Sequence, residues 1–149
     1  MSLKKKLNIA VVGATGYTGL DLVYMLSKHS KIKILNLCAT KNLGKKISFF
    51  DNRIKKNLPK ISSIKDVNWQ KIDLVFLSLP NGEAQKLIKE TFNKHKKLKY
   101  IDLSADFRIK DAKVYLKSYK IKHKAINLIK ESHYSICEFS KDKIQKYKI

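Results

Sequence analysis

Three glycines spaced three residues apart, Gly13, Gly16 and Gly19, are the residues of this chain whose spacing points most directly to chemistry. They follow an apolar run at 7–12 and precede a stretch with apolar residues at helical spacing. The first backbone N–H groups of a helix have no partners within the helix, and the helix dipole adds partial positive charge there. A helix that begins inside these glycines is therefore expected to bind phosphate groups.

Each glycine of this turn has its own predicted role. Gly13 allows a sharp turn out of the strand, Gly16 removes a Cβ that would hold a pyrophosphate away, and Gly19 lets the helix pack closely against the sheet. The pattern is a variant of the usual Gly-x-Gly-x-x-Gly fingerprint, and a glycine-rich turn without a ligand is the alternative. The predicted cofactor contacts in this segment are Gly13, Thr15, Gly16, Tyr17, Thr18 and Gly19.

The elements around the turn are predicted to alternate between strands and helices. Segments 41–70 and 111–149 are expected to hold loops with short elements, including a last helix through 144–147 with Ser140 as its N-cap. The alternation indicates an α/β fold, a Rossmann-like doubly wound parallel sheet. Strands are predicted at 7–12, 33–40, 72–80 and 98–104, and helices at 17–27 and 84–92.

Two further segments are expected at the same sheet edge, because the carboxyl ends of parallel strands lie together. Thr40 and Lys41 lie at the end of the second strand, where NAD enzymes usually place an acidic residue for the ribose 2′-hydroxyl. A hydroxyl and a cation suit a 2′-phosphate, so NADP is predicted in preference to NAD. Pro80, Asn81 and Gly82 lie at the end of the third predicted strand and complete the predicted cofactor site.

The formal charge of +21 would suit a nucleic-acid binder. Only Arg53 and Arg108 among the 33 basic residues are arginine, however, and sites for bases and phosphates favour the planar guanidinium. The lysines are spread over nearly every segment. We therefore expect no nucleic-acid partner, and a charge-driven nucleic-acid binder remains the alternative.

Other function classes receive little support from the sequence. The apolar run after the N-terminal lysines is too short for a signal peptide, and no run is long enough to span a membrane, so a cytoplasmic protein without membrane contact is expected. The scattered His29, His95, His123 and His133 give no metal site. Cys38 is expected in a buried strand, and a disulfide with Cys137 has no support.

Five stretches of the sequence carry a family resemblance: GATGYTG, LSLPNGEAQ, YIDLSADFRIKD, YLKSYKIKH and YSICEF. In their order and spacing they resemble the N-acetyl-gamma-glutamyl-phosphate reductases of arginine biosynthesis. Aspartate-semialdehyde dehydrogenases share the glycine turn but not the run at 103–108. Asn81 and Ser135 depart from the family, which usually has His and Gly there. The resemblance covers essentially the whole chain but only the first part of the family's pattern.

The resemblance implies NADP-dependent reduction of N-acetyl-gamma-glutamyl phosphate to N-acetylglutamate semialdehyde. In that family a cysteine thiolate attacks the acyl phosphate, and hydride from NADPH reduces the resulting thioester. The family's cysteine follows the segment matched here, and Cys137 matches a proline, so no catalytic residue is expected in this chain. Ser104, Asp106 and Arg108 are expected on the substrate side, with a salt bridge between Asp106 and Arg108 as the alternative.

The sequence thus predicts one NAD(P)-binding domain over residues 1–149, truncated before an α+β substrate or catalytic domain. We expect it to bind cofactor weakly and to show no turnover alone, whereas the full enzyme is expected to be a homo-oligomer. The alternatives are a noncatalytic NADP-binding or redox-sensing domain, an aspartate-semialdehyde dehydrogenase-like reductase, and the nucleic-acid binder.

Overall fold

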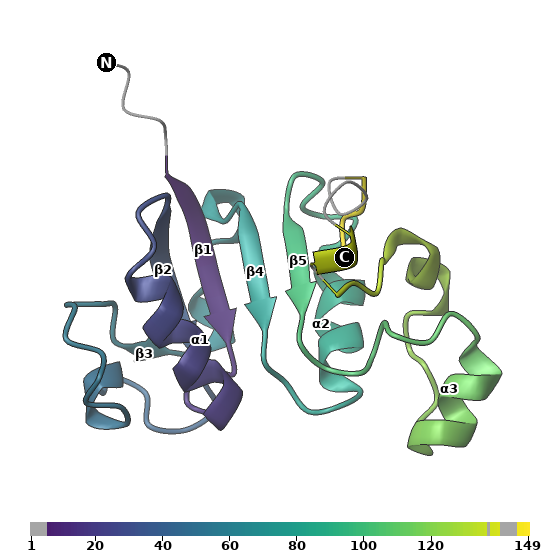
Figure 1. The fold of residues 1–149 in the computed structure, drawn as a ribbon, viewed down its shortest axis with the longest axis horizontal. Coiled ribbons are helices and arrows are strands. Elements are labelled where there is room, and N and C mark those ends of the chain that lie inside the picture. The colour runs from purple at the N-terminus through teal and green to yellow at the C-terminus, as the bar shows by residue number, and fades with distance from the viewer. Residues whose placement is uncertain (1–5, 137, 141–145) are drawn as a thin grey trace.

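A parallel β-sheet forms the centre of the molecule (Figure 1). The computed structural model describes residues 6–136, 138–140 and 146–149. Within them the sheet has five strands in the order β3-β2-β1-β4-β5, and every neighbouring pair is parallel. This confirms the predicted α/β class. The strands are β1 (Leu7–Val12), β2 (Ile32–Cys38), β3 (Ile61–Ser62), β4 (Leu74–Leu77) and β5 (Lys99–Asp102).

Helices connect the strands and extend the fold beyond β5. Figure 1 shows α3 outside the sheet, past β5, while the arrowheads of β1, β4 and β5 point to one common edge. The α-helices are α1 (Tyr17–Ser27), α2 (Glu83–Thr91) and α3 (Ala112–Tyr119), and short 3-10 turns lie at Ile47–Phe49, Ile64–Asp66, Trp69–Lys71 and Ile126–Glu131.

Both faces of the sheet are buried, as the alternation of side chains along β1 shows. Ile9 belongs to a buried cluster that includes Leu22 of α1. Its neighbour Ala10 belongs to the cluster on the other face, which includes Ile88 of α2. Burying one large aliphatic side chain contributes roughly 1.5–3 kcal/mol, so α1 is held against one face of the sheet and α2 against the other. The fold is doubly wound, as predicted.

Three strands, β2, β4 and β5, end earlier than predicted, whereas β1 ends at Val12 as predicted. β2 ends at Cys38, whose carbonyl oxygen accepts hydrogen bonds from the N–H groups of Gly13 and Ala14 at 2.9 and 3.0 Å. β5 ends at Asp102, whose carboxylate accepts from the N–H of Ser104 at 2.9 Å and turns the chain. Residues 39–41, 78–82 and 103–108 therefore form loops at the carboxyl edge.

β3 is a strand that the sequence analysis missed. It lies in the segment 41–70, which was correctly predicted to hold loops with short elements. It has two residues, and its register is set by pairing with Leu37 and Cys38 of β2. Ile61 is buried, so β3 closes the core at this edge of the sheet.

The predicted last helix falls mainly on 141–145, which lie outside the described residues, as does Cys137. At its described ends the prediction is wrong. Ser140 is itself helical, within 138–140, so it is no N-cap, and Tyr147 is not helical. The final residues instead lie beside β5, where the N–H of Tyr100 donates to the carbonyl oxygen of Lys148 at 2.9 Å.

The described residues form neither a membrane-spanning helix nor a cluster of metal ligands. In that part of the chain, each helix is either too short or too polar to cross a lipid bilayer. No three His, Cys, Asp or Glu side chains gather there in an arrangement that could hold a metal ion.

Candidate nucleotide-binding edge

Gly13 brings the loop after β1 against the loop after β4. Its φ is +83°, in the left-handed region that favours glycine. A Cβ at this position would lie 1.9 Å from the carbonyl oxygen of Ser78. The turn therefore depends on glycine, as predicted, and it lies between β1 and β4, where the strand order reverses. Ligands of doubly wound sheets bind at this switch point.

Gly19 allows α1 to pack onto the glycine turn. A Cβ there would lie 2.1 Å from the carbonyl oxygen of Gly13 and 3.0 Å from backbone atoms of Ala14. The prediction placed this close contact between the helix and the sheet. In the structure the close contact instead joins α1 to the glycine turn that precedes it.

Gly16 differs from the other two glycines, because the surrounding protein leaves space for a side chain. It is the N-cap of α1 with φ −75° and ψ 165°, a conformation open to any residue. A Cβ here would meet only the carbonyl oxygen of Gly13, at an ordinary 3.6 Å. The packing of the chain itself therefore does not require glycine at this position.

The N-terminus of α1 offers backbone donors at an exposed position. Tyr17 and Thr18 are its first residues, so their N–H groups have no carbonyl one turn earlier in the helix. The side chain of Tyr17 is 95% exposed, and Thr18 is also exposed, whereas Thr15 is half-buried. No acidic residue lies in the first turn, and Gly16 supplies no side-chain cap. The positive end of this helix is thus open to an anion.

The N-terminus of α2, at the same edge, is already occupied by a carboxylate of the chain. Gly82, its N-cap, has φ +91° and donates its N–H to both carboxylate oxygens of Asp106, at 2.8 and 2.9 Å. The N–H of Gln85 donates to the same carboxylate at 3.1 Å. An anionic ligand therefore finds open donors at α1 rather than at α2.

Asp106 lies at the centre of a buried polar network. The hydroxyl of Tyr115 donates to its carboxylate at 2.6 Å, and Nε2 of Gln85 donates to that hydroxyl at 3.2 Å. Nδ1 of His123 accepts from the N–H of Ala125 at 3.1 Å, so its Nε2 carries the proton and donates to the carbonyl oxygen of Asp106 at 2.8 Å. Burial and the Asp106 carboxylate raise the pKa of Tyr115, and burial lowers the pKa of His123.

The three residues predicted to face a substrate differ in their surroundings. Asp106 is fully buried, and the Ser104 hydroxyl donates to Asp102 at 2.9 Å while accepting from the N–H of Asp106 at 3.1 Å. Arg108 is exposed, and its Nε donates to the carbonyl oxygen of Ser104 at 3.0 Å. Within the described residues Asp106 and Arg108 form no ion pair, so the salt-bridge alternative was wrong.

The remaining predicted residues also lie on loops at this edge (Figure 1). Thr40 and Lys41 are exposed after β2, and Pro80 and Asn81 are exposed after β4. The side-chain oxygen of Asn81 accepts from the N–H of Ala105 at 3.3 Å, which ties this loop to the one after β5. The fold thus brings all the predicted cofactor residues to the edge of the sheet where the parallel strands end.

Sequence reasoning missed Gln85 and Tyr115, which are both fully buried. Tyr115 lies in the segment 111–149, which was predicted to hold loops with short elements, and the sequence indicated no partner for its hydroxyl. Gln85 is polar and lies beside the apolar face of α2. Its burial is explained by side-chain hydrogen bonds to partners distant in sequence, to the Tyr115 hydroxyl at 3.2 Å and from the N–H of Lys124.

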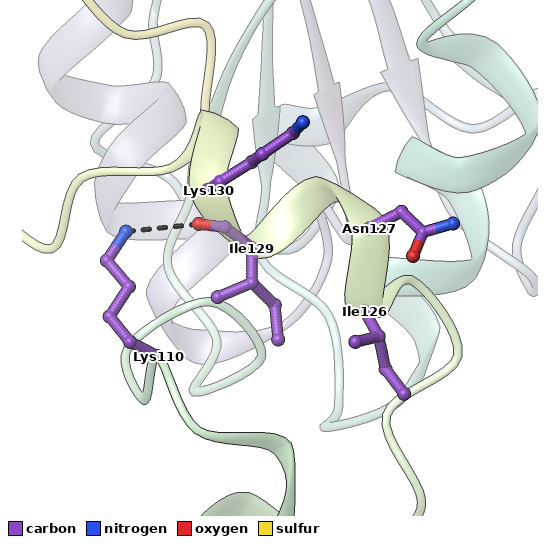
Figure 2. A pocket seen from close by; sticks show the side chains of 5 residues that line it. All are labelled: Lys110, Ile126, Asn127, Ile129 and Lys130. Atoms are coloured by element: carbon purple, nitrogen blue, oxygen red, sulfur yellow. Dashed lines mark hydrogen bonds between the residues drawn. The ribbon is translucent and has the colours of Figure 1, made fainter.

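A pocket of about 440 Å³ lies away from the glycine turn, between Lys110 and the 3-10 turn Ile126–Glu131 (Figure 2). Figure 2 shows the Lys110 side chain reaching the carbonyl oxygen of Ile129, at 3.0 Å, and its ammonium also donates to Ser132. Burial lowers the pKa of Lys110. Because this cation is bound to the chain and no predicted site residue lines the pocket, the nucleotide-binding edge stays the candidate site. The lining residues are Lys110, Ile126, Asn127, Ile129 and Lys130.

Comparisons with known proteins identify the family of this chain. Residues 8–147 match the family described as semialdehyde dehydrogenase, NAD binding domain. The N-acetyl-gamma-glutamyl-phosphate reductase of Ehrlichia canis (strain Jake) is 43% identical over 143 residues, which cover 95% of this chain and 40% of that protein. A probable chloroplastic N-acetyl-gamma-glutamyl-phosphate reductase of Oryza sativa subsp. japonica is 35% identical, over 95% of this chain and 34% of that protein.

The likeness also extends to solved structures. Aspartate semialdehyde dehydrogenase with NADP from Candida albicans superposes with a TM-score of 0.55 at 23% identity, over 72% of this chain and 32% of that one, and confirms the fold. The chain spans about two fifths of the length of the Ehrlichia canis relative, at 40%. Since the family match covers nearly every residue, the chain belongs to the semialdehyde dehydrogenase family, as its NAD-binding domain.

Proposed function

We propose that this chain is the NADP-binding part of an N-acetyl-gamma-glutamyl-phosphate reductase, which reduces that acyl phosphate to N-acetylglutamate semialdehyde. The names of relatives at 35% and 43% identity support the substrate. The family match and the fold support the nicotinamide cofactor.

The observation that carries the cofactor proposal is the space at Gly16. Gly13 and Gly19 are needed by the chain's own packing, since a Cβ at either would overlap backbone. Gly16 is not, since a Cβ there would meet only an atom at 3.6 Å. A glycine without a steric reason inside the protein, next to open helix donors, fits a ligand that must approach the backbone closely.

Different residues at this edge would bind different parts of the cofactor. The N–H groups of Tyr17 and Thr18 would hold the pyrophosphate, and Thr40 and Lys41 would hold the 2′-phosphate. The turn at 80–82 would line the nicotinamide side. When bound, the nucleotide supplies the hydride for the reduction. The residues of this chain bind and orient it.

Arg108 is the residue best placed for the substrate. It is exposed at the carboxyl end of β5, and its guanidinium has more N–H groups than the two hydrogen bonds to Ser104 and Leu103 use. A planar guanidinium suits a carboxylate or phosphate. In our proposal Ser104 and Asp106 hold the loop that presents Arg108.

Titration with NADPH tests the cofactor proposal. Gly16→Val adds a β-branched side chain where the pyrophosphate would lie, and we expect NADPH affinity to fall at least about a hundredfold while the circular dichroism spectrum stays unchanged. Ser118→Val places the same side chain at an exposed position of α3 and serves as the control. A folded Gly16→Val protein that binds NADPH as tightly as the wild type would refute the proposal.

The substrate is tested separately on the native enzyme that contains this chain. We expect kcat/KM, measured by NADPH oxidation, to be at least about tenfold higher for N-acetyl-gamma-glutamyl phosphate than for aspartyl phosphate. A preference for aspartyl phosphate would favour the aspartate-semialdehyde dehydrogenase-like alternative.

A further inference from the structure

We propose that Asp106 is a positioning residue, whose buried carboxylate fixes the turn at 80–82 in the shape that receives the nicotinamide half of the cofactor. This inference rests on the proposed NADP-binding function and adds a role for a residue that the sequence analysis assigned to the substrate side. Asp106 itself reaches no ligand, because its side chain is fully buried.

The carboxylate of Asp106 is saturated by donors of its own chain. One oxygen accepts from the hydroxyl of Tyr115 at 2.6 Å and from the N–H of Gly82 at 2.8 Å. The other accepts from the N–H of Gly82 at 2.9 Å and from that of Gln85 at 3.1 Å. Two of the three donor groups belong to the N-cap and the first turn of α2, so the carboxylate replaces the side-chain cap that Gly82 lacks.

The turn held in this way is conformationally demanding. Gly82 has φ +91°, and the residues just before it, Pro80 and Asn81, are exposed. Asn81 is tied to the N–H of Ala105 at 3.3 Å. The loop after β5 thus contacts the turn at two successive residues, one through Asn81 and one through Gly82, while Pro80 and Asn81 remain exposed to solvent.

Asp106 is in turn held in place by buried neighbours. Tyr115 and Gln85 have no exposed surface, and Gln85 donates to the Tyr115 hydroxyl at 3.2 Å. His123 holds the main chain of Asp106 through its carbonyl oxygen at 2.8 Å. The carboxylate therefore cannot follow a displaced turn without breaking contacts to α3 and to the 121–125 segment. A rigid anchor of this kind positions the residues that do touch a ligand.

The strand order decides which half of the cofactor this turn meets. β1 lies between β2 and β4. With the pyrophosphate over the turn after β1 and the 2′-phosphate at Thr40 and Lys41 after β2, the other half of the dinucleotide extends over the loop after β4. That loop is the turn at 80–82. Loosening it should therefore weaken contacts with the nicotinamide half and spare the adenosine half.

The test compares two nucleotides in the full chain: NADPH and 2′-phospho-ADP-ribose, which lacks the nicotinamide. In Asp106→Asn one oxygen becomes an NH₂ donor, which faces the N–H groups of Gly82 and Gln85 or leaves the Tyr115 hydroxyl without an acceptor. We expect NADPH affinity to fall about tenfold and 2′-phospho-ADP-ribose affinity to change less than about threefold, because the binding-competent turn becomes a minor state.

Asp111→Asn is the matched control. Asp111 caps α3 by accepting from the N–H groups of Lys113 and Val114, at 2.7 and 3.0 Å, so the variant makes the same chemical change at another helix start. We expect it to leave the ratio of the two affinities unchanged. If Asp106→Asn fails to fold, Tyr115→Phe removes one donor to the carboxylate, and we expect a selective loss of NADPH affinity of about threefold.

Each outcome has a separate meaning. A selective loss of NADPH affinity in a folded Asp106→Asn protein supports the inference. Equal loss of both nucleotides, or no loss of either, overturns it and leaves the proposed function standing, provided that the wild type binds both. A wild-type chain that binds neither nucleotide overturns the proposed function and the inference together.

Discussion

Replacing Gly19 by alanine should destabilise this protein, although the same change stabilises most helices. Alanine is favoured over glycine inside a helix by about 1 kcal/mol. Here, however, the added Cβ would lie 2.1 Å from the carbonyl oxygen of Gly13 and 3.0 Å from backbone atoms of Ala14. The outcome depends on whether this overlap costs more than the gain in helix propensity.

The structure indicates that the overlap costs more. The Cβ must move about 0.9 Å to reach the 3.0 Å below which real Cβ contacts essentially never fall. The opposing atoms are backbone and cannot rotate away, and Gly13 already lies against the carbonyl oxygen of Ser78. Overpacking of this kind costs roughly 1–3 kcal/mol, and a rigid site lies at the upper end. The net loss should be about 2 kcal/mol after the propensity gain.

Urea unfolding followed by circular dichroism measures this loss. With a slope of about 2 kcal/mol/M, the midpoint of Gly19→Ala should fall by about 1 M. Gly16→Ser is the matched comparison, because Gly16 has space for a side chain and serine is a favourable N-cap, so its stability should stay within about 0.5 kcal/mol of wild type. A Gly19→Ala protein at least as stable as wild type would refute the steric reasoning.

Three further predictions use other residues. Lys41→Ala should weaken NADPH binding about tenfold and leave NADH binding unchanged, as parallel fluorescence titrations would show, because only NADPH carries the 2′-phosphate. Burial lowers the folded-state pKa of His123 below the roughly 6.5 of an unfolded histidine, so its stabilisation is complete above that pH and is lost as the pH falls. The urea midpoint should therefore drop from pH 7 to pH 5.5 in wild type, and that component should be missing in His123→Gln. Burial raises the pKa of Cys38 to about 11, so in a Cys137→Ser background its thiol should react with a disulfide reagent near neutral pH only after unfolding; rapid reaction of the folded protein would contradict this.

The elements that the sequence predicted well are those set by local pattern. The apolar run at 7–12, the glycine turn and the periodic residues that follow predicted β1 and α1 with their observed bounds. Each of these depends on residues close in the chain: a sharp turn needs Gly13, and an amphipathic helix needs its own apolar face. The choice of sheet edge followed from the alternation of strands and helices.

The features that escaped prediction depend on partners distant in sequence. β3 exists because Leu37 and Cys38 pair with it, and two residues carry too little pattern to show that. The contacts of Asp106 come from groups 24, 21 and 9 residues away, at Gly82, Gln85 and Tyr115. A carboxylate inside such a network looks the same in sequence as one that meets a substrate. Only the folded structure shows that the Asp106 carboxylate is buried within the chain.

The outer margins of the sheet affect how copies of this chain can meet. β3 has only two residues, so it presents a very short row of backbone groups to a neighbour. On the far margin, the N–H of Tyr100 is already bonded to Lys148. A second molecule therefore finds little backbone to continue the ladder, which disfavours fibre-like stacking. Copies of this protein should therefore associate through their side chains and not through backbone hydrogen bonds at the sheet edges. Substitutions at the surface would then be enough to change which partner is bound.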